Sequence, residues 1–546
     1  MSDAIATDTP SRVALRIHPD DDLGVALIDL PAGRKIILDN QSVHLIESVR
    51  QKHKFALRSL SARSAVTLYG VVVGRVTEAV PAGGAIGTHN LVHATVDDGA
   101  LAERRAWQPP CVERFENATF EGYHRPDGRV GTANLWLVVP LVFCENRNVE
   151  VLRQCVADAL GEDPFRDYKR MARHMLHGAA DPQPDTEITS RPFPNVDGVR
   201  FLTHTQGCGG TNDDARALCR LLAGYICHPN VAGATVLGLG CQKSEADMLR
   251  EAISEYDPDG TRRVDFFEQQ AIESEEKLIH DALASIFRGL EMANRLTRRP
   301  APLSQLMIGL ECGGSDGFSG ISANPLVGET VDRLIALGGS AMLSEFPELC
   351  GVEHELMARC MDTTIAERFQ TLMSAYQRHA DAVGADFAMN PSPGNIRDGL
   401  ITDAMKSAGA ARKGGGSPIV DVVDYTRTPR RAGLSLLCTP GNDVESTTAL
   451  AGSGANLILF TTGLGTPTGN PVAPVLKIAS NTALAERMGD VIDFDAGPIV
   501  RGECEPGELA NALLTLCIDT ASGRYQSCAQ RLSQHDFIPW KRGVSL

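Results

Sequence analysis

The chain has 546 residues, of which 43% are hydrophobic and 22% charged, and its formal net charge is −16. This length predicts about two to four globular domains, and the acidic balance disfavours nucleic acid or an anionic membrane as a partner. There is no run of 18 apolar residues, and the N-terminal MSDAIATDTPSR lacks a basic stretch followed by an apolar core. Together with 14 scattered cysteines, these features predict a cytoplasmic protein with reduced thiols.

The first part of the chain reads as a small, mostly-β domain at 1–95. Short apolar runs such as GVALIDL and AVTLYGVVVGRV alternate with turn formers between about 13 and 90. The mixed, proline-containing segment 96–119 is a plausible linker.

From about residue 120, strands alternate with amphipathic helical stretches such as NVEVLRQCVADALG and NDDARALCRLLAGYI. This alternation predicts βαβ units and parallel sheets. We expect one α/β domain at 120–298 and a second at 299–546, which is rich in glycine loops such as GGSDGFSG. GLGCQKS lacks the spacing of a phosphate loop, so the glycines indicate tight turns or a close approach of backbone to a small ligand.

Four cysteines end buried-strand patterns: Cys144, Cys208, Cys241 and Cys312. Ligands of open parallel sheets bind outside the carboxyl ends of the strands, so we expect these four cysteines to point into one crevice. They could be inert buried thiols, thiolate ligands of iron or zinc, or ligands of an iron–sulfur cluster. The CxxC spacings of zinc ribbons and ferredoxins are absent, so the fold would have to assemble any shared site.

Other residues near the predicted strand ends could take part in chemistry. His204 is either a structural histidine or a metal ligand or general base. The candidate cations for a substrate carboxylate are Arg125, Arg129, Lys406, Lys413 and Lys477, and the candidate carboxylates are Glu311, Asp316, Glu345 and Glu348. The residues alone predict an α/β enzyme with a metal and a small anionic substrate, without specifying the reaction.

At these same residues the sequence resembles the altronate and galactarate dehydratase family, most closely its altronate members. The resemblance covers nearly the whole chain. The motifs that carry it include FEGYHRPDGRVGTAN at 120–134, HTQGCG at 204–209, GLECGGSDGFSGISANP at 309–325, SEFPE at 344–348, NPSPGN at 390–395, FTTGLGTPTG at 460–469 and KIASNT at 477–482. HKFAL, YGVVVGRV and THN resemble the family's N-terminal SAF domain. The implied fold is a small mostly-β SAF-like domain followed by two α/β domains with largely parallel sheets.

The resemblance implies dehydration of an aldonate or aldarate, such as D-altronate, to a 2-keto-3-deoxy acid. It implies dependence on Fe²⁺, with Mn²⁺ or an iron–sulfur cluster with an open iron as alternatives. Removal of the weakly acidic C2 proton needs a base and strong stabilisation of the enediolate. The implied catalytic residues are His204, Lys406 and Glu345, and the implied metal ligands are Cys144, Cys208, Cys241 and Cys312. The implied substrate-binding residues are Arg125, Arg129, Ser315, Asp316, Asn324, Asn390, Ser392, Asn395 and Lys477. A homodimer is possible.

Two positions depart from the family pattern. Leu464 replaces an arginine of the glycine loop, and Ala404 replaces a glutamate two residues before Lys406. A lost ion pair would explain both changes, because removing only one partner leaves a charge unpaired. The favoured interpretation is a dehydratase with shifted specificity. The alternatives are galactarate dehydratase or sulfolactate-type sulfo-lyase activity within the same family, which share the C2 deprotonation, and a non-catalytic homologue that binds a sugar acid or metal.

Overall fold

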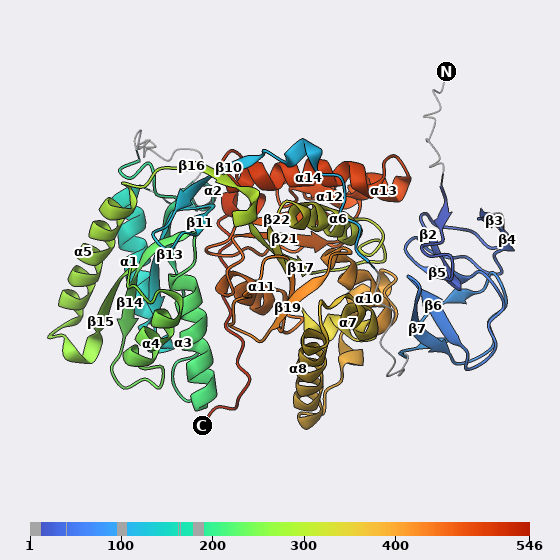
Figure 1. Cartoon of the computed structure of the whole chain (residues 1–546), viewed down its shortest axis with the longest axis horizontal. Helices are drawn as coiled ribbons and strands as arrows, with labels where there is room; N and C mark the ends of the chain where they lie inside the picture. Colours follow the sequence, from blue (N-terminus) through green and yellow to red (C-terminus); the bar gives the residue numbers. More distant parts are fainter. Residues whose placement is uncertain (1–11, 40, 96–105, 162, 164, 178–190) are drawn as a thin grey trace, which may run out of the picture.

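The computed structural model describes residues 12–39, 41–95, 106–161, 163, 165–177 and 191–546. Figure 1 shows three bodies in a row: the N-terminal β domain in blue, the C-terminal α/β domain in the middle and the second domain at the far end. The expected linker at 96–119 begins with ten residues outside the described part. No helix in the described ranges is long and apolar enough to cross a membrane.

The N-terminal domain consists of short antiparallel strands in three small sheets. The sheets are β1 (Ala14–Leu15), β2 (Leu23–Ala26), β5 (Lys54–Ala56) and β8 (Ala85–Ile86); β3 (Lys35–Leu38) and β4 (Gln41–His44); and β6 (Ala65–Leu68), β7 (Val71–Val76) and β9 (Leu91–Val92). The domain docks on α10 (Asp403–Ala410) of the C-terminal domain, where Thr402 Oγ1 donates to the carbonyl of Val73 at 2.6 Å.

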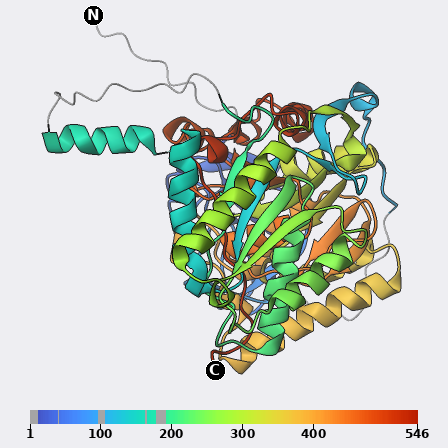
Figure 2. The same cartoon turned by 90° about the vertical axis from the view of Figure 1, so that its left-hand side faces the viewer.

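The second domain is built on a parallel sheet, in the order β13 (Gly198–Phe201), β12 (Leu135–Pro140), β14 (Val231–Gly238) and β15 (Arg263–Glu268). All six residues of β12 are buried because helices cover both faces. α1 (Asn146–Leu160) and α5 (Glu275–Ala293) pack on one face, and α3 (Asn212–Ile226) and α4 (Ala246–Tyr256) pack on the other. Figure 2 looks onto this domain.

The C-terminal domain holds a seven-stranded parallel sheet. Its order is β19 (Ile419–Val423), β20 (Leu434–Leu437), β18 (Ser340–Leu343), β17 (Met307–Cys312), β21 (Leu457–Thr462), β22 (Val475–Ala479) and β23 (Phe494–Asp495). α6 (Ala323–Ala336) and α14 (Pro506–Ala521) pack on one face, while α11 (Asp443–Gly452) packs on the other against α3. A Cβ on Gly224 would lie 2.0 Å from the carbonyl oxygen of Gly452, so this helix contact requires glycine.

The fold class is as predicted: a small SAF-type β domain followed by two α/β domains with parallel sheets. One element differs from the expected pattern. The sequence predicts Cys208 at the end of a buried strand, but the strand before it, β13, already ends at Phe201. Residues after Phe201 turn away from the sheet through Gly207 and Gly209, whose φ angles are +99° and +66°.

Candidate functional site

The structure corrects the expectation that four cysteines share one crevice. Cys144, Cys208 and Cys241 follow β12, β13 and β14 of the second domain and are exposed. Cys312 is buried at the end of β17, in the sheet of the other α/β domain. Local sequence placed Cys312 correctly at the end of a strand and Cys144 and Cys241 shortly after one, whereas β13 ends at Phe201, well before Cys208. Which strands share a sheet depends on long-range pairing.

Cys312 belongs to a buried cluster that we call the acidic centre. It lies where β17 and β18 end, beside the short helices η5 (Phe346–Leu349) and η7 (Ala411–Gly414), α10 and the start of α11. Its members are Glu311, Cys312, Glu345, Glu348, Asp403, Lys406, Lys413 and Asp443.

Direct contacts connect these side chains. Lys413 Nζ lies 2.7 Å from both Cys312 Sγ and Glu345 Oε2. Cys312 Sγ lies 3.4 Å from Glu348 Oε2. On the other side of Glu348, Lys406 Nζ donates to Glu348 Oε1 at 2.5 Å and to Asn390 Oδ1 at 2.7 Å. The centre therefore alternates carboxylates with ammonium groups.

Glu345 occupies an unusual backbone conformation. Its φ of +66° is in the left-handed region, which costs a non-glycine residue about 1–3 kcal/mol. The conformation is held because its backbone N–H donates to Thr439 Oγ1 at 2.8 Å and its Oε2 accepts from the backbone N–H of Cys312 at 3.2 Å. Strained backbone of this kind clusters at active sites, where a side chain is held in a fixed orientation, and this supports a functional role for Glu345.

The acidic centre has an excess of negative groups, with five carboxyl groups against two lysines. Burial and the neighbouring Glu345 raise the pKa of Glu311 well above its ordinary value, and burial and Glu348 raise that of Glu345. Burial, with Glu345 close by, raises the pKa of Asp443 to about 7. Burial opposes the charge of Lys413, but Cys312 and Glu345 outweigh it and raise the pKa of Lys413.

The donor set fits a divalent cation. Among the described residues, one sulfur and two carboxylate oxygens, from Cys312, Glu345 and Glu348, lie within 4.8 Å of one another. Glu345 Oε1 is buried and has no hydrogen-bond partner within the described chain, so it can accept a proton, and a cation bound by the other donor atoms of the set would offset the negative excess. Sulfur with carboxylate suits a transition metal such as Fe²⁺ better than Ca²⁺ or Mg²⁺.

A second polar group surrounds Asp316, in the loop after β17. Asp316 accepts from Lys52 Nζ of the β domain at 2.9 Å and from Ser480 Oγ at 2.8 Å. Asn395 Nδ2 donates to the carbonyl of Ser315 at 2.7 Å, and Ser392 caps the short helix that contains Asn395. The loop therefore joins four predicted substrate-binding residues: Ser315, Asp316, Ser392 and Asn395.

The remaining predicted substrate-binding residues have other surroundings. Asn390 accepts from Lys406, and Asn324 donates to Gly409 and accepts from Thr461. The guanidinium of Arg125 is buried and donates to the carbonyls of Ala133 and Pro229 and to Asn134 Oδ1. Arg129 pairs with Asp127 and donates to the carbonyl of Cys227. Lys477 donates to Gln534 Oε1, and burial lowers its pKa to about 8.

Both ring nitrogens of His204 are already engaged. Nδ1 accepts from the backbone N–H of Gln206 at 3.1 Å, so Nε2 carries the proton and donates to the carbonyl of Pro140 at 2.8 Å. Burial lowers the pKa of His204 to about 4, which makes the ring neutral near pH 7. In this arrangement His204 ties the end of β12 to the loop of Cys208.

Sequence reasoning missed Lys52, Asp403 and Asp443. Lys52 immediately precedes the HKFAL motif, and its neighbour Lys54 is fully buried, with Nζ donating to the carbonyls of Lys52 and Gly399. Two lysines so close to an apolar strand were the sequence signal that could have pointed to Lys52, because a lysine is rarely buried without a partner. Asp403 and Asp443 are the first residues of α10 and α11, where acidic residues commonly stabilise a helix N-terminus.

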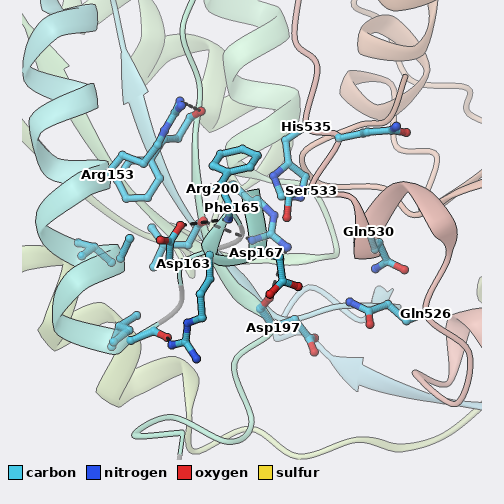
Figure 3. A pocket seen from close by; sticks show the side chains of 18 of the residues that line it. Arg153, Asp163, Phe165, Asp167, Asp197, Arg200, Gln526, Gln530, Ser533 and His535 are labelled. Carbon is cyan, nitrogen blue, oxygen red and sulfur yellow. Dashed lines mark hydrogen bonds between the residues drawn. The ribbon is translucent and has the colours of Figure 1, made fainter. Parts of the chain in front are cut away.

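A large cavity of about 1080 Å³ lies elsewhere, between the two α/β domains. Figure 3 shows it, with Arg153 and Asp163 from the second domain and Ser533 and His535 from the C-terminal segment. Its described lining includes none of the predicted site residues. None of the residues of the acidic centre lines this cavity.

A parallel α/β sheet with buried carboxylates, lysines and a metal-capable donor set at its carboxyl end is the arrangement of an enzyme that acts on a small ligand. Three family models match the chain in order: the SAF domain of altronate/galactarate dehydratase at 12–94, the second domain of D-galactarate dehydratase/altronate hydrolase at 122–294, and the C-terminal domain of D-galactarate/altronate dehydratase at 303–545.

Full-length relatives agree with these matches. The altronate dehydratase of Escherichia coli strain K12 is 34% identical, with 97% of this chain and 99% of the relative aligned. That of Bacillus subtilis strain 168 is 33% identical over the same shares. The galactarate dehydratase (L-threo-forming) of E. coli is 31% identical, with 97% of each chain aligned. The chain belongs to the altronate and galactarate dehydratase family.

Proposed function

We propose that this chain is a sugar-acid dehydratase that converts an aldonate or aldarate, such as D-altronate, to a 2-keto-3-deoxy acid. The observation that carries the proposal is the acidic centre. It combines a metal-capable donor set with two lysines at the carboxyl end of a parallel sheet. Family membership over the full chain supports the same reaction class.

The proposed metal ligands are Cys312, Glu345 and Glu348. A divalent cation bound there would supply positive charge to stabilise the enediolate that forms when C2 loses its proton. Fe²⁺ is our first choice and Mn²⁺ the second. The metal-ligand role that the sequence suggested for Cys312 thus acquires two carboxylate partners.

The side chains of the centre provide the remaining steps. Lys406, on the more accessible side of the centre, binds the substrate carboxylate. Glu345 accepts the C2 proton at Oε1, and its raised pKa makes it a stronger base than an ordinary glutamate. Lys413 stabilises the developing negative charge. Asp443, with a pKa of about 7, returns a proton to the departing C3 hydroxyl, so that the C3–O bond breaks, water leaves and the enol ketonises.

The polyol chain of the substrate would contact the loop after β17. Ser315 Oγ is buried without a hydrogen-bond partner in the described chain, so it can bind a substrate hydroxyl. Asp316, the next residue of the loop, and Asn390, which accepts from Lys406, are the further polar residues that we assign to the polyol. His204, Arg125 and Arg129 are not assigned to substrate here, because their polar atoms are committed to the second domain.

The proposal is tested with protein loaded anaerobically with Fe²⁺ and incubated with a panel of aldonates and aldarates in deuterated water. We expect NMR to show a 2-keto-3-deoxy product from one acid. Glu345→Gln should abolish both C2 exchange and elimination, while Glu355→Gln, an exposed neighbour on the next helix, should change neither. Sulfite release from a sulfonated hydroxy acid would instead indicate a sulfo-lyase. Metal-loaded protein that neither exchanges nor eliminates with any acid would refute an enzymatic role.

A further inference from the structure

We propose that Arg397 is a specificity-determining residue of the sugar-acid site. Its guanidinium binds the end of the substrate that is remote from C2 and C3, and it favours an acid with a second carboxylate at that end over an acid that ends in a hydroxyl. The inference rests on the proposed function, because it takes the acidic centre as the place of the reaction.

A short segment connects the proposed residue to the acidic centre. Asn390 accepts from Lys406 of the centre at 2.7 Å, and three positions later the chain enters α9 (Pro393–Arg397). Asn395 Nδ2 ties α9 to the loop after β17 by donating to the carbonyl of Ser315 at 2.7 Å. A sugar acid with its reacting carboxylate at Lys406 and a hydroxyl at Ser315 would therefore lie along this segment and point toward the end of α9.

The guanidinium of Arg397 lies beside the loops that we assign to the polyol. A Cβ on Gly394 would lie 3.8 Å from Arg397 Nη2 and 3.9 Å from Leu464 Cδ1. Ser392 Oγ would lie 3.5 Å from the same Cβ. Leu464 also borders the loop after β17, because a Cβ on Gly314 would lie 3.5 Å from Leu464 Cβ. One leucine side chain thus separates the guanidinium from the loop of the polyol.

The charge of Arg397 is available to a ligand. Within the described ranges, its guanidinium forms no hydrogen bond or ion pair, and the side chain is exposed. The neighbouring lysines have partners inside the protein. Lys52 pairs with Asp316 and Asp398, and Lys54 Nζ donates to two backbone carbonyls. Arg397 can therefore bind a carboxylate without losing an interaction that stabilises the fold.

The backbone that carries this guanidinium is held by the β domain. His53 Nε2 donates to the carbonyl of Arg397 at 3.0 Å. At the next residue, Asp398 Oδ1 lies 3.0 Å from Lys52 Nζ. The position of the helix end is therefore set before a ligand arrives, and binding has to order only the arginine side chain, which lowers the entropic cost.

This arrangement fits a dicarboxylic sugar acid better than a monocarboxylic one. An aldarate carries a carboxylate at each end, whereas an aldonate ends in a hydroxyl. An arginine binds a carboxylate through two parallel charge-assisted hydrogen bonds, which are stronger than the neutral bonds that a hydroxyl makes. The chain carries a net charge of −16, so a local cation is needed to hold the second negative charge of an aldarate.

The test uses the full chain loaded anaerobically with Fe²⁺ and pairs of acids that differ only at the far end, such as D-altrarate with D-altronate and galactarate with galactonate. We expect Arg397→Met to raise the KM for the aldarate about tenfold, with little change in kcat or in the KM for the aldonate. Arg397→Lys should keep part of the preference, because it keeps the charge. Arg378→Met, an exposed arginine on α8 (Thr363–Ala382), is the matched control and should change neither constant.

A second variant separates binding from structure. Leu464→Arg places a new guanidinium on the other side of Gly394. In the Arg397→Met background it should restore the low KM for the aldarate, because the charge returns to the same place. A purely structural role of Arg397 would not be restored in this way. Thermal unfolding of each variant checks that the fold is intact.

The possible outcomes separate this inference from the proposed function. Unchanged KM values for the aldarates in Arg397→Met, equal increases for both kinds of acid, or turnover of aldonates alone would each overturn the inference and leave the dehydratase function standing. If no acid reacts or exchanges at C2, the proposed function fails. Calorimetric titration of the metal-loaded chain with the aldarates then decides the role of Arg397. Binding that weakens about tenfold in Arg397→Met supports it, whereas equal binding or none overturns it.

Discussion

Lys52 of the β domain lies with its Nζ 2.9 Å from Asp316 Oδ2 in the C-terminal domain. The same ammonium lies 3.0 Å from Asp398 Oδ1. Burial opposes the charge of Lys52, but the two aspartates outweigh it and raise the pKa of Lys52. Because Asp316 is fully buried, this pair fixes the β domain against the loop that we propose binds the substrate polyol.

We expect Lys52→Met to lower the stability of the docked β domain by about 3 kcal/mol, because removing one partner of a buried pair leaves the other charge uncompensated. Limited proteolysis should cut the β domain away faster in the variant, and the KM for the sugar acid should rise. Lys35→Met removes an exposed lysine of the same domain and serves as the matched control. Equal cleavage rates in the variant and the unsubstituted chain would show that the pair does not hold the domains together.

The sequence predicts that Arg125 binds substrate, whereas its surroundings in the structure indicate a role in stability. Its guanidinium donates to two backbone carbonyls and to Asn134. We expect Arg125→Met to lower the free energy of unfolding by about 3 kcal/mol, because three buried acceptors lose a charged donor, and to leave KM unchanged below the melting temperature. A substrate role would instead raise KM tenfold or more with unchanged stability. Arg250→Met, exposed on α4, is the control for loss of an arginine.

Asp403 predicts a pH dependence of stability. Burial, with Glu348 close by, raises its pKa from 3.8 to about 8, so between about pH 4 and 8 the folded chain binds a proton that the unfolded chain does not. Its contribution to stability is therefore full below pH 4 and lost as pH rises toward 8, with a slope of at most about 1.4 kcal/mol per pH unit.

We expect Asp403→Asn to melt at about the same temperature as the unsubstituted chain near pH 4.5, and at a higher temperature at pH 8, when both are measured in a chelator. The neutral amide removes the cost of ionising a buried carboxyl. Asp259→Asn, an exposed site, should leave the pH profile unchanged. A profile for Asp403→Asn parallel to that of the unsubstituted chain would mean that Asp403 is not protonated in the folded state.

The two departures from the family pattern have different neighbours. Leu464 lies beside Gly314 and Gly394, whereas Ala404 contacts Gly351 and its backbone N–H approaches His93 Nδ1 at 3.4 Å. We therefore expect Leu464→Arg and Ala404→Glu to act independently. In a double-mutant cycle their effects on unfolding free energy should add within about 0.5 kcal/mol. A favourable coupling above about 1 kcal/mol would restore the lost-ion-pair hypothesis. Because Leu464 adjoins the loop after β17, Leu464→Arg should also change the ratio of kcat/KM between aldarates and aldonates.

The sequence by itself determined the elements and the class of fold. Apolar runs ending at Cys144, Cys241 and Cys312 became β12, β14 and β17 with their following loops, because a buried parallel strand needs a continuous apolar segment. The helix patterns became α1 and α3, and α3 occupies the expected 15 residues. Long family motifs gave the reaction class, since they extend over the whole chain.

Only the tertiary structure decided which residues meet. Cys312 finds Glu345 and Glu348 rather than the other cysteines, because strands far apart in sequence pair to form each sheet. Lys52 reaches Asp316 from another domain, across 264 positions of sequence. Arg125 and His204 carry the residue types of a binding site, yet their polar atoms are used to join loops of the second domain. Local periodicity specifies strands and helices, while hydrogen-bond partners depend on contacts that form only when the domains pack.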